Sequence, residues 1–165
     1  MFYKKISIIL IVFMMMFSGA CFAGTNENVS DAKELSNDYK DISDMFTIGM
    51  NYNDYSALYK KATLYNHRFD RKYKDEILMQ NIIGEANNVQ ALYDLISNVW
   101  SHKITSNMTD ISLSSEIRNK YPRLKELHGD IWGDFDTDSV LQILIGYQNE
   151  KIENLDNMIK TIDHE

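Results

Sequence analysis

Residues 145–162, IGYQNEKIENLDNMIKTI, indicate the fold more directly than any other stretch. Large side chains recur there at alternating spacings of three and four, at Ile145, Gln148, Ile152, Leu155, Ile159 and Ile162. This period places them on one face of a single helix, as in the seam of a coiled coil. Such a face has to be buried. The segment therefore predicts a long final helix, capped at Asp138, that packs against other helices or against a second copy of the chain.

The same period recurs near the start of the chain. A first helix is predicted from an apolar stripe that consists of Leu35, Tyr39, Ile42 and Phe46. Ser30 or Asp31 can cap its start, and Gly49 can end it. Asp54 can cap a second helix, in which we expect a short turn near Asn66.

Two more helical segments are predicted before the final helix. One covers roughly 70–102, and Gly84 can kink it. The other begins at Asp110 or Ser112, and Pro122 either kinks it or opens a short new helix. No stretch shows the alternation and hairpin turns of paired strands. The sequence therefore predicts an all-α fold, an up-and-down bundle of four to five helices.

The first 23 residues have the pattern of a cleaved signal peptide. Two lysines precede a run over 6–17 that is apolar except for Ser7, and small residues lead up to Ala23. The run is too short to span a bilayer comfortably. We therefore expect a signal peptide over 1–23, a flexible lead over 24–29 and a single helical-bundle domain over 30–165, with no transmembrane span in the mature chain.

Cys21 is the only cysteine, and it lies inside this leader. With the two small residues before it, Cys21 partly matches a bacterial lipobox, in which the cysteine is lipidated and becomes the new N-terminus. Ser18 stands where a branched apolar residue is usual, and ordinary cleavage after Ala23 would remove the thiol altogether. The leader thus predicts export to the periplasm or the outside of a bacterial cell, or alternatively an envelope lipoprotein anchored through Cys21.

The charge of the chain is acidic overall and uneven along its length. The net charge is −7, from 17 basic and 24 acidic residues, which argues against nucleic acid as a general partner. Between Tyr55 and Lys74, however, the sequence contains six basic residues and only one acidic residue. This segment is either a cationic patch for an anionic partner or a counterweight to the acidic final helix around Glu150.

Tyrosines interleave with these basic residues. Rings with polar tips and arginine guanidinium groups suit a partner that carries carboxylates or phosphates, although tyrosines at helical spacing also suit a core. The loop between Gly129 and Gly133 adds Trp132, which either contacts a partner or plugs the end of the bundle. The predicted contact residues are Tyr55, Tyr59, Arg68, Arg71, Lys72 and Trp132.

No motif in the sequence points to a reaction, a metal or a cofactor. Asp134, Asp136 and Asp138 alternate as at the start of a calcium-binding loop. Ser139 stands where that loop needs glycine, and Ile145 stands where it needs glutamate, so a solvated acidic loop explains the residues better. The four histidines have no zinc-site spacing, and no nucleophile or nucleotide motif is present. We predict no catalytic residue, metal or cofactor.

Three functions are consistent with this pattern. The favoured one is an exported, non-catalytic module that binds another envelope or extracellular protein, as an adaptor or an inhibitor. The second is a small-ligand carrier whose tyrosine stripe lines a cavity between helices. The third is an envelope hydrolase, which needs two carboxyls across a groove, at least one of them with a raised pKa; Glu76 and Glu85, on the third predicted helix, are ordinary solvated positions.

Overall fold

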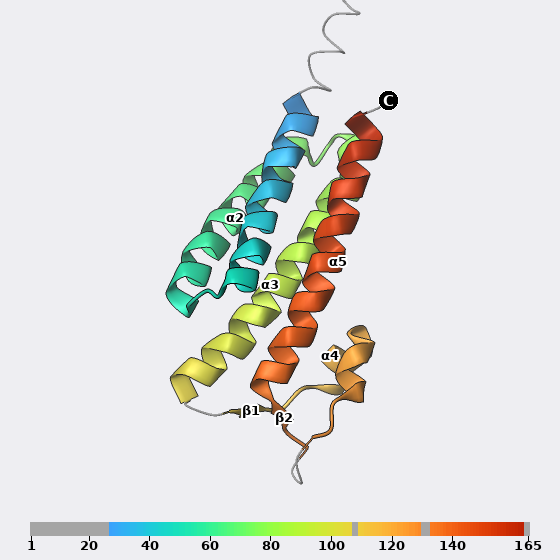
Figure 1. The fold of residues 1–165 in the computed structure, drawn as a ribbon. Helices are drawn as coiled ribbons and strands as arrows, with labels where there is room; N and C mark the ends of the chain where they lie inside the picture. Colours follow the sequence, from blue (N-terminus) through green and yellow to red (C-terminus); the bar gives the residue numbers. More distant parts are fainter. Residues whose placement is uncertain (1–26, 107–108, 130–132, 164–165) are drawn as a thin grey trace, which may run out of the picture.

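The computed structural model describes residues 27–106, 109–129 and 133–163. Its framework is all-α, as predicted, and its long helices run alternately up and down the molecule (Figure 1). These helices are helix 27–48, α2 (Tyr52–Tyr73), α3 (Gln80–Ser106) and α5 (Thr137–Asp163). In the described part of the chain, no helix is both long and apolar enough to cross a bilayer.

Short elements connect the long helices. The 3-10 helix η1 (Ile77–Met79) joins α2 to α3, and the connection from α3 to α5 contains β1 (Asp110–Ile111), α4 (Ser115–Lys120), η2 (Pro122–Glu126) and β2 (Phe135–Asp136). β1 and β2 form an antiparallel pair of two residues each. Strands this short show no alternation, so the sequence pattern did not reveal them. Pro122 opens η2, which is one of the two outcomes predicted for it.

Helix 27–48 includes more of the chain than the sequence predicted. Residues 27–29, assigned to a flexible lead, are already helical, upstream of both predicted caps. Val29 is 5% exposed and Ala32 is fully buried, so the apolar stripe extends beyond the residues that defined it. The helical residues stop just before Gly49, whose φ of 91° is a left-handed conformation that favours glycine.

The start and continuity of α2 also differ from the prediction. Asn51 caps the helix in place of Asp54, because the Asn51 Oδ1 accepts hydrogen bonds from the backbone N–H groups of Asn53 and Asp54 at 2.9 and 3.0 Å. The helix then continues through Asn66 without the expected turn. Asn66 is buried, and its amide N–H donates to Asn87 Oδ1 of α3 at 2.9 Å, so the donor has a partner within the bundle. Its Oδ1 accepts no hydrogen bond from the described residues.

Asn51→Ala should lower the free energy of unfolding by about 1 kcal/mol, since it leaves two N–H groups of the first turn without their acceptor. Urea denaturation followed by circular dichroism measures the change. Asn53→Ala is the matched control, because Asn53 is exposed in the same turn and its side chain is not the cap. An equal effect of the two substitutions would contradict the assignment of the cap.

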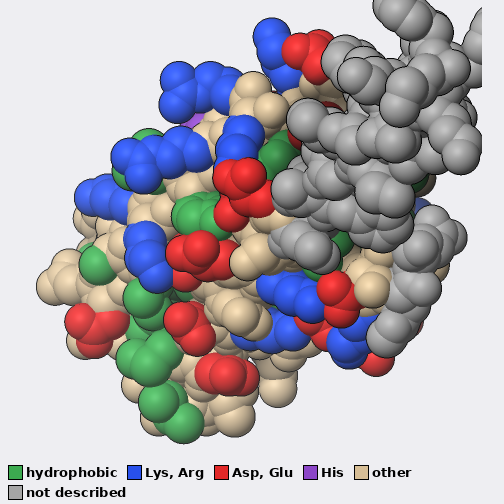
Figure 2. All heavy atoms as spheres, turned by 90° about the horizontal axis from the view of Figure 1, so that it is seen from above, with side chains coloured by type: hydrophobic (Ala, Val, Ile, Leu, Met, Phe, Trp, Pro, Cys, Tyr) green, Lys and Arg blue, Asp and Glu red, His purple; other side chains and the backbone are tan. Residues whose placement is uncertain are grey.

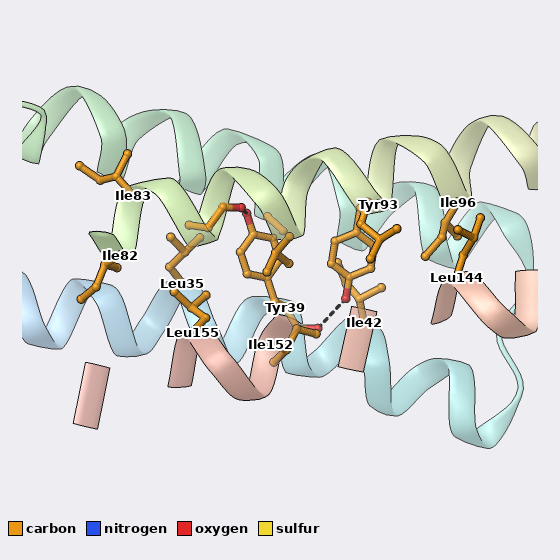
Figure 3. Packing of buried hydrophobic residues seen from close by; sticks show 14 of the residues in the cluster. Leu35, Tyr39, Ile42, Ile82, Ile83, Tyr93, Ile96, Leu144, Ile152 and Leu155 are labelled. Carbon is orange, nitrogen blue, oxygen red and sulfur yellow. Dashed lines mark hydrogen bonds between the residues drawn. The ribbon is translucent and has the colours of Figure 1, made fainter. Parts of the chain in front are cut away.

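The core lies between helix 27–48, α2, α3 and α5, and Figure 3 shows Leu35, Tyr93 and Leu155 among its members. The seam predicted on the final helix is buried inside this core at Gln148, Ile152, Leu155 and Ile159. Its outermost residues, Ile145 and Ile162, are partly buried and pack against the same core. The seam is therefore used within the bundle.

Candidate functional site

The tyrosine stripe of α2 lies partly in the core. Tyr55 is fully buried, and its hydroxyl donates to the main-chain oxygen of Tyr93 at 2.8 Å. Tyr93 in turn donates to the main-chain oxygen of Tyr39 at 2.8 Å, and the rings of Tyr39 and Tyr93 stack at 5.6 Å (Figure 3). Tyr55 was predicted to contact a partner, and this prediction is wrong, because the side chain has no exposed surface. These rings and hydroxyls contact one another, so this part of the stripe forms core rather than the wall of a ligand cavity.

Tyr59 lies at the edge of the same cluster. It is half-buried, its ring stacks on Tyr55 at 5.8 Å, and its hydroxyl donates to Asp94 of α3. Burial and the bond to Asp94 raise the pKa of the Tyr59 hydroxyl. Part of the ring is accessible, but its polar group already has a partner.

Lys61 and Lys72 are paired with carboxylates of helix 27–48. The Lys61 Nζ lies 2.6 Å from Asp38 Oδ1, and the Lys72 Nζ lies 2.7 Å from both Glu27 and Asp31. Burial opposes ionisation of Asp31, but the hydrogen bonds from Lys72 and Tyr73 outweigh it and lower the pKa of the carboxyl. Lys72, one of the predicted contact residues, thus serves to attach helix 27–48 to α2.

Acidic residues of α5 form ion pairs with basic residues that lie outside α2. Asp156 accepts hydrogen bonds from Lys160, at 2.6 Å, and from Lys40, and these bonds lower the pKa of its carboxyl. Glu150 pairs with Arg123 at 2.5 Å. The sequence was also consistent with the basic residues of α2 balancing the negative charge of α5. These ion pairs of α5 are formed with basic residues outside α2 instead.

Four basic residues remain exposed on the outer side of α2 and at its C-terminal cap. They are Lys60, Arg68, Arg71 and Lys74, which we call the α2 cationic face. At 3.6 residues per turn, these positions fall on roughly one third of the circumference of the helix. None of them forms an ion pair with a carboxylate in the described ranges; Arg71 Nε donates only to the main-chain oxygen of His67. Figure 2, which looks onto the end of the bundle where α2 stops, shows several Lys and Arg side chains along one edge of the molecule and others that lie among acidic side chains.

Most basic residues outside α2 do have acidic partners. Those with an ion pair are Lys33, Lys40, Lys103, Arg123, Lys151 and Lys160. The α2 cationic face also carries Leu64, which is 50% exposed. Cations without internal partners beside an apolar side chain make this face the part of α2 that is best suited to an anionic partner.

The acidic residues that alternate as at the start of a calcium-binding loop have separate roles. Asp136 accepts hydrogen bonds from the Ser139 hydroxyl and N–H at 2.6 and 2.8 Å, so it caps α5, and these bonds lower its pKa. Asp138 pairs with Lys103 at 2.6 Å. Over the ranges that the structure describes, no three histidine, cysteine or acidic side chains are placed to hold a metal ion.

The two glutamates considered for a hydrolase are bound within the fold. Glu76 accepts a hydrogen bond from Asn28 at 2.8 Å, and Glu85 accepts one from Lys151 at 3.1 Å. The pKa of Asp31, of Asp136 and of Asp156 is lowered in the fold. A general acid requires the opposite shift.

Of the predicted contact residues, the structure brings Arg68 and Arg71 together on an exposed face and joins Lys60 and Lys74 to them. The helical spacing of these four could have revealed the face. Trp132 and Cys21 lie outside the described residues, so their roles stay predictions. No family model, curated protein or solved structure matches this chain.

Proposed function

We propose that this is an exported, non-catalytic interaction module that binds an acidic surface of another protein in the bacterial envelope or outside the cell. The observation that carries the proposal is the α2 cationic face, four exposed basic residues that pair with no carboxylate of the described residues, on a chain of net charge −7. An adaptor or an inhibitor would both use such a face.

The chemistry of the face suits carboxylates. Arg68 and Arg71 are one helical turn apart, and each guanidinium can bind a carboxylate through two parallel hydrogen bonds. Lys60 and Lys74 extend the positive charge along the helix and would accelerate encounter with an acidic partner. Leu64 supplies an apolar contact between them. The acidic remainder of the protein would repel the same partner, which favours a single orientation.

Export is proposed from the leader rather than from the helices. Cleavage after Ala23 gives a protein without a thiol, whereas lipidation of Cys21 gives an envelope lipoprotein. The mass of the protein recovered from cells distinguishes the two products. Either product presents the α2 cationic face outside the cytoplasm.

Charge reversal on the face should abolish partner binding. We expect Arg68→Glu with Arg71→Glu to reduce capture of a specific envelope or extracellular protein by at least about tenfold, because both arginines would become repulsive at the centre of the contact. The measurement is quantitative affinity capture from native extract, repeated at rising salt. Binding by the unaltered protein should weaken as salt screens the charges.

The matched control is Lys120→Glu with Lys125→Glu, which makes the same change in net charge at two exposed lysines away from α2. Capture should survive in this variant. Lys72 is left intact, because its bonds to Glu27 and Asp31 belong to the fold. Retention of the partner by the arginine variant, or equal loss in both variants while circular dichroism shows them folded, would reject the cationic face as the binding surface.

A further inference from the structure

The seam between α3 and α5 is uncovered at one end of the bundle. Helix 27–48 packs against α5 in antiparallel register, with the Ser43 hydroxyl 2.5 Å from Asn149 Oδ1. In this register the last residue of helix 27–48 lies beside α5 about two turns from the N-terminal end of α5, and Figure 1 shows α3 and α5 continuing past it. The early end of helix 27–48 at Gly49 therefore leaves a groove between the two longer helices.

This groove is a pocket of about 530 Å³. Apolar side chains from three helices line it, namely Phe46, Trp100, Leu141 and Ile145. The rings of Phe46 and Trp100 lie 5.7 Å apart at a tilt of 33° and form an aromatic wall. The volume is that of a small-molecule site, and no residue of α2 is among those that line it.

A cation lies in the lining of the groove. The Lys103 Nζ is 2.6 Å from both carboxylate oxygens of Asp138, and both residues line the pocket. The side chains are 34% and 70% exposed, respectively. An ion pair this exposed contributes little to stability, so a second anion can displace the Asp138 carboxylate at small cost.

We propose that the groove binds a small amphipathic anion. Its apolar, ring-sized body rests on Phe46 and Trp100, and its carboxylate or sulfonate takes the place of Asp138 at Lys103. The site is separate from the α2 cationic face, so it stands whether or not that face binds a protein.

Tryptophan fluorescence tests this proposal directly. Trp132→Phe leaves Trp100 as the only tryptophan of the chain, inside the groove. The purified protein is titrated with anilinonaphthalene sulfonate, which has an aromatic body and one negative charge, and with the uncharged phenylnaphthylamine. Both probes should quench Trp100 with saturation at one molecule per chain.

Substitutions then separate the charged from the apolar contribution. Lys103→Met should weaken the sulfonate about fivefold and leave the neutral probe unchanged, since only the charged contact is lost. Asp138→Asn should tighten the sulfonate by a factor of about two to five, because it removes the competing carboxylate. Ile145→Glu should abolish quenching by both probes. The control is Lys60→Met, which makes the same charge change on α2 and should alter neither affinity.

Three results would overturn the proposal. The first is that neither probe quenches Trp100 with saturation. The second is that the Lys103 and Asp138 variants bind the sulfonate with the same affinity as the parent protein. The third is that the Lys60 variant no longer binds the sulfonate, which would assign binding to the α2 cationic face. If Ile145→Glu does not fold by circular dichroism, the opposite shifts expected of the Lys103 and Asp138 variants still decide the question.

Discussion

Tyr93→Ala should lower the free energy of unfolding by about 4 kcal/mol, because it removes a large side chain from the centre of the core. Tyr93 is fully buried, stacks on Tyr39 and approaches Tyr55 with ring centroids 6.3 Å apart. Its hydroxyl also supplies the hydrogen bond to the Tyr39 main-chain oxygen. Urea denaturation monitored by circular dichroism measures the loss.

Two controls test whether the loss of stability comes from burial of the Tyr93 ring. One removes only the hydroxyl, and the other removes a less buried tyrosine. Tyr93→Phe keeps the ring and should cost only about 1 kcal/mol, the usual contribution of one hydrogen bond. Tyr65→Ala removes a half-buried tyrosine of α2 and should cost far less than Tyr93→Ala, because less of its ring is packed. If Tyr93→Ala cost no more than Tyr93→Phe, the ring would not be a core element.

Raising the pH above about 10 should unfold the protein cooperatively, because tyrosine ionises near that value in an unfolded chain. Burial raises the pKa of Tyr39, Tyr55 and Tyr93 well above it, and burial together with the bond to Asp31 raises the pKa of Tyr73 to about 12. The folded state therefore holds these protons more tightly than the unfolded state. The corresponding stability is fully present below pH 10 and is lost as the pH rises toward the folded pKa values.

Phenolate absorbance and helical circular dichroism, recorded together during an alkaline titration, measure this effect. We expect most phenolate signal to appear in step with the loss of helix. Tyr39→Phe with Tyr55→Phe removes two of the linked groups, so the free energy of unfolding should fall less steeply with pH in that variant. Ionisation of all tyrosines near pH 10 with the helices intact would contradict the burial of these hydroxyls.

Much of the helical framework follows from local sequence. The stripe of Leu35, Tyr39 and Ile42 and the seam of α5 both have helical period, and both are buried in the structure. Smaller features were missed because two local signals competed. Asn51 and Asp54 are both good caps three residues apart, and Asn66 looks like a turn residue unless its partner on α3 is known.

The candidate site was only partly predictable. Lys72 and Arg71 are adjacent in the sequence and chemically similar, yet one pairs with helix 27–48 and the other is exposed without an acidic partner in the described part. Periodicity places residues on faces of a helix, but it does not say which neighbouring helix covers each face. Tyr55 illustrates the same limit of periodicity. It was predicted to contact a partner at the surface, but it is buried and its hydroxyl bonds to the main-chain oxygen of Tyr93.

The sequence by itself determined the helical class, the anionic character and the pattern of an export leader, because these depend on composition and on spacing within single segments. Tertiary structure alone decided which tyrosines are core, which cations remain unpaired among the described residues, and where the α3–α5 groove opens. These properties depend on contacts between residues far apart in the chain. The groove, for instance, exists because helix 27–48 is shorter than the helices it packs beside.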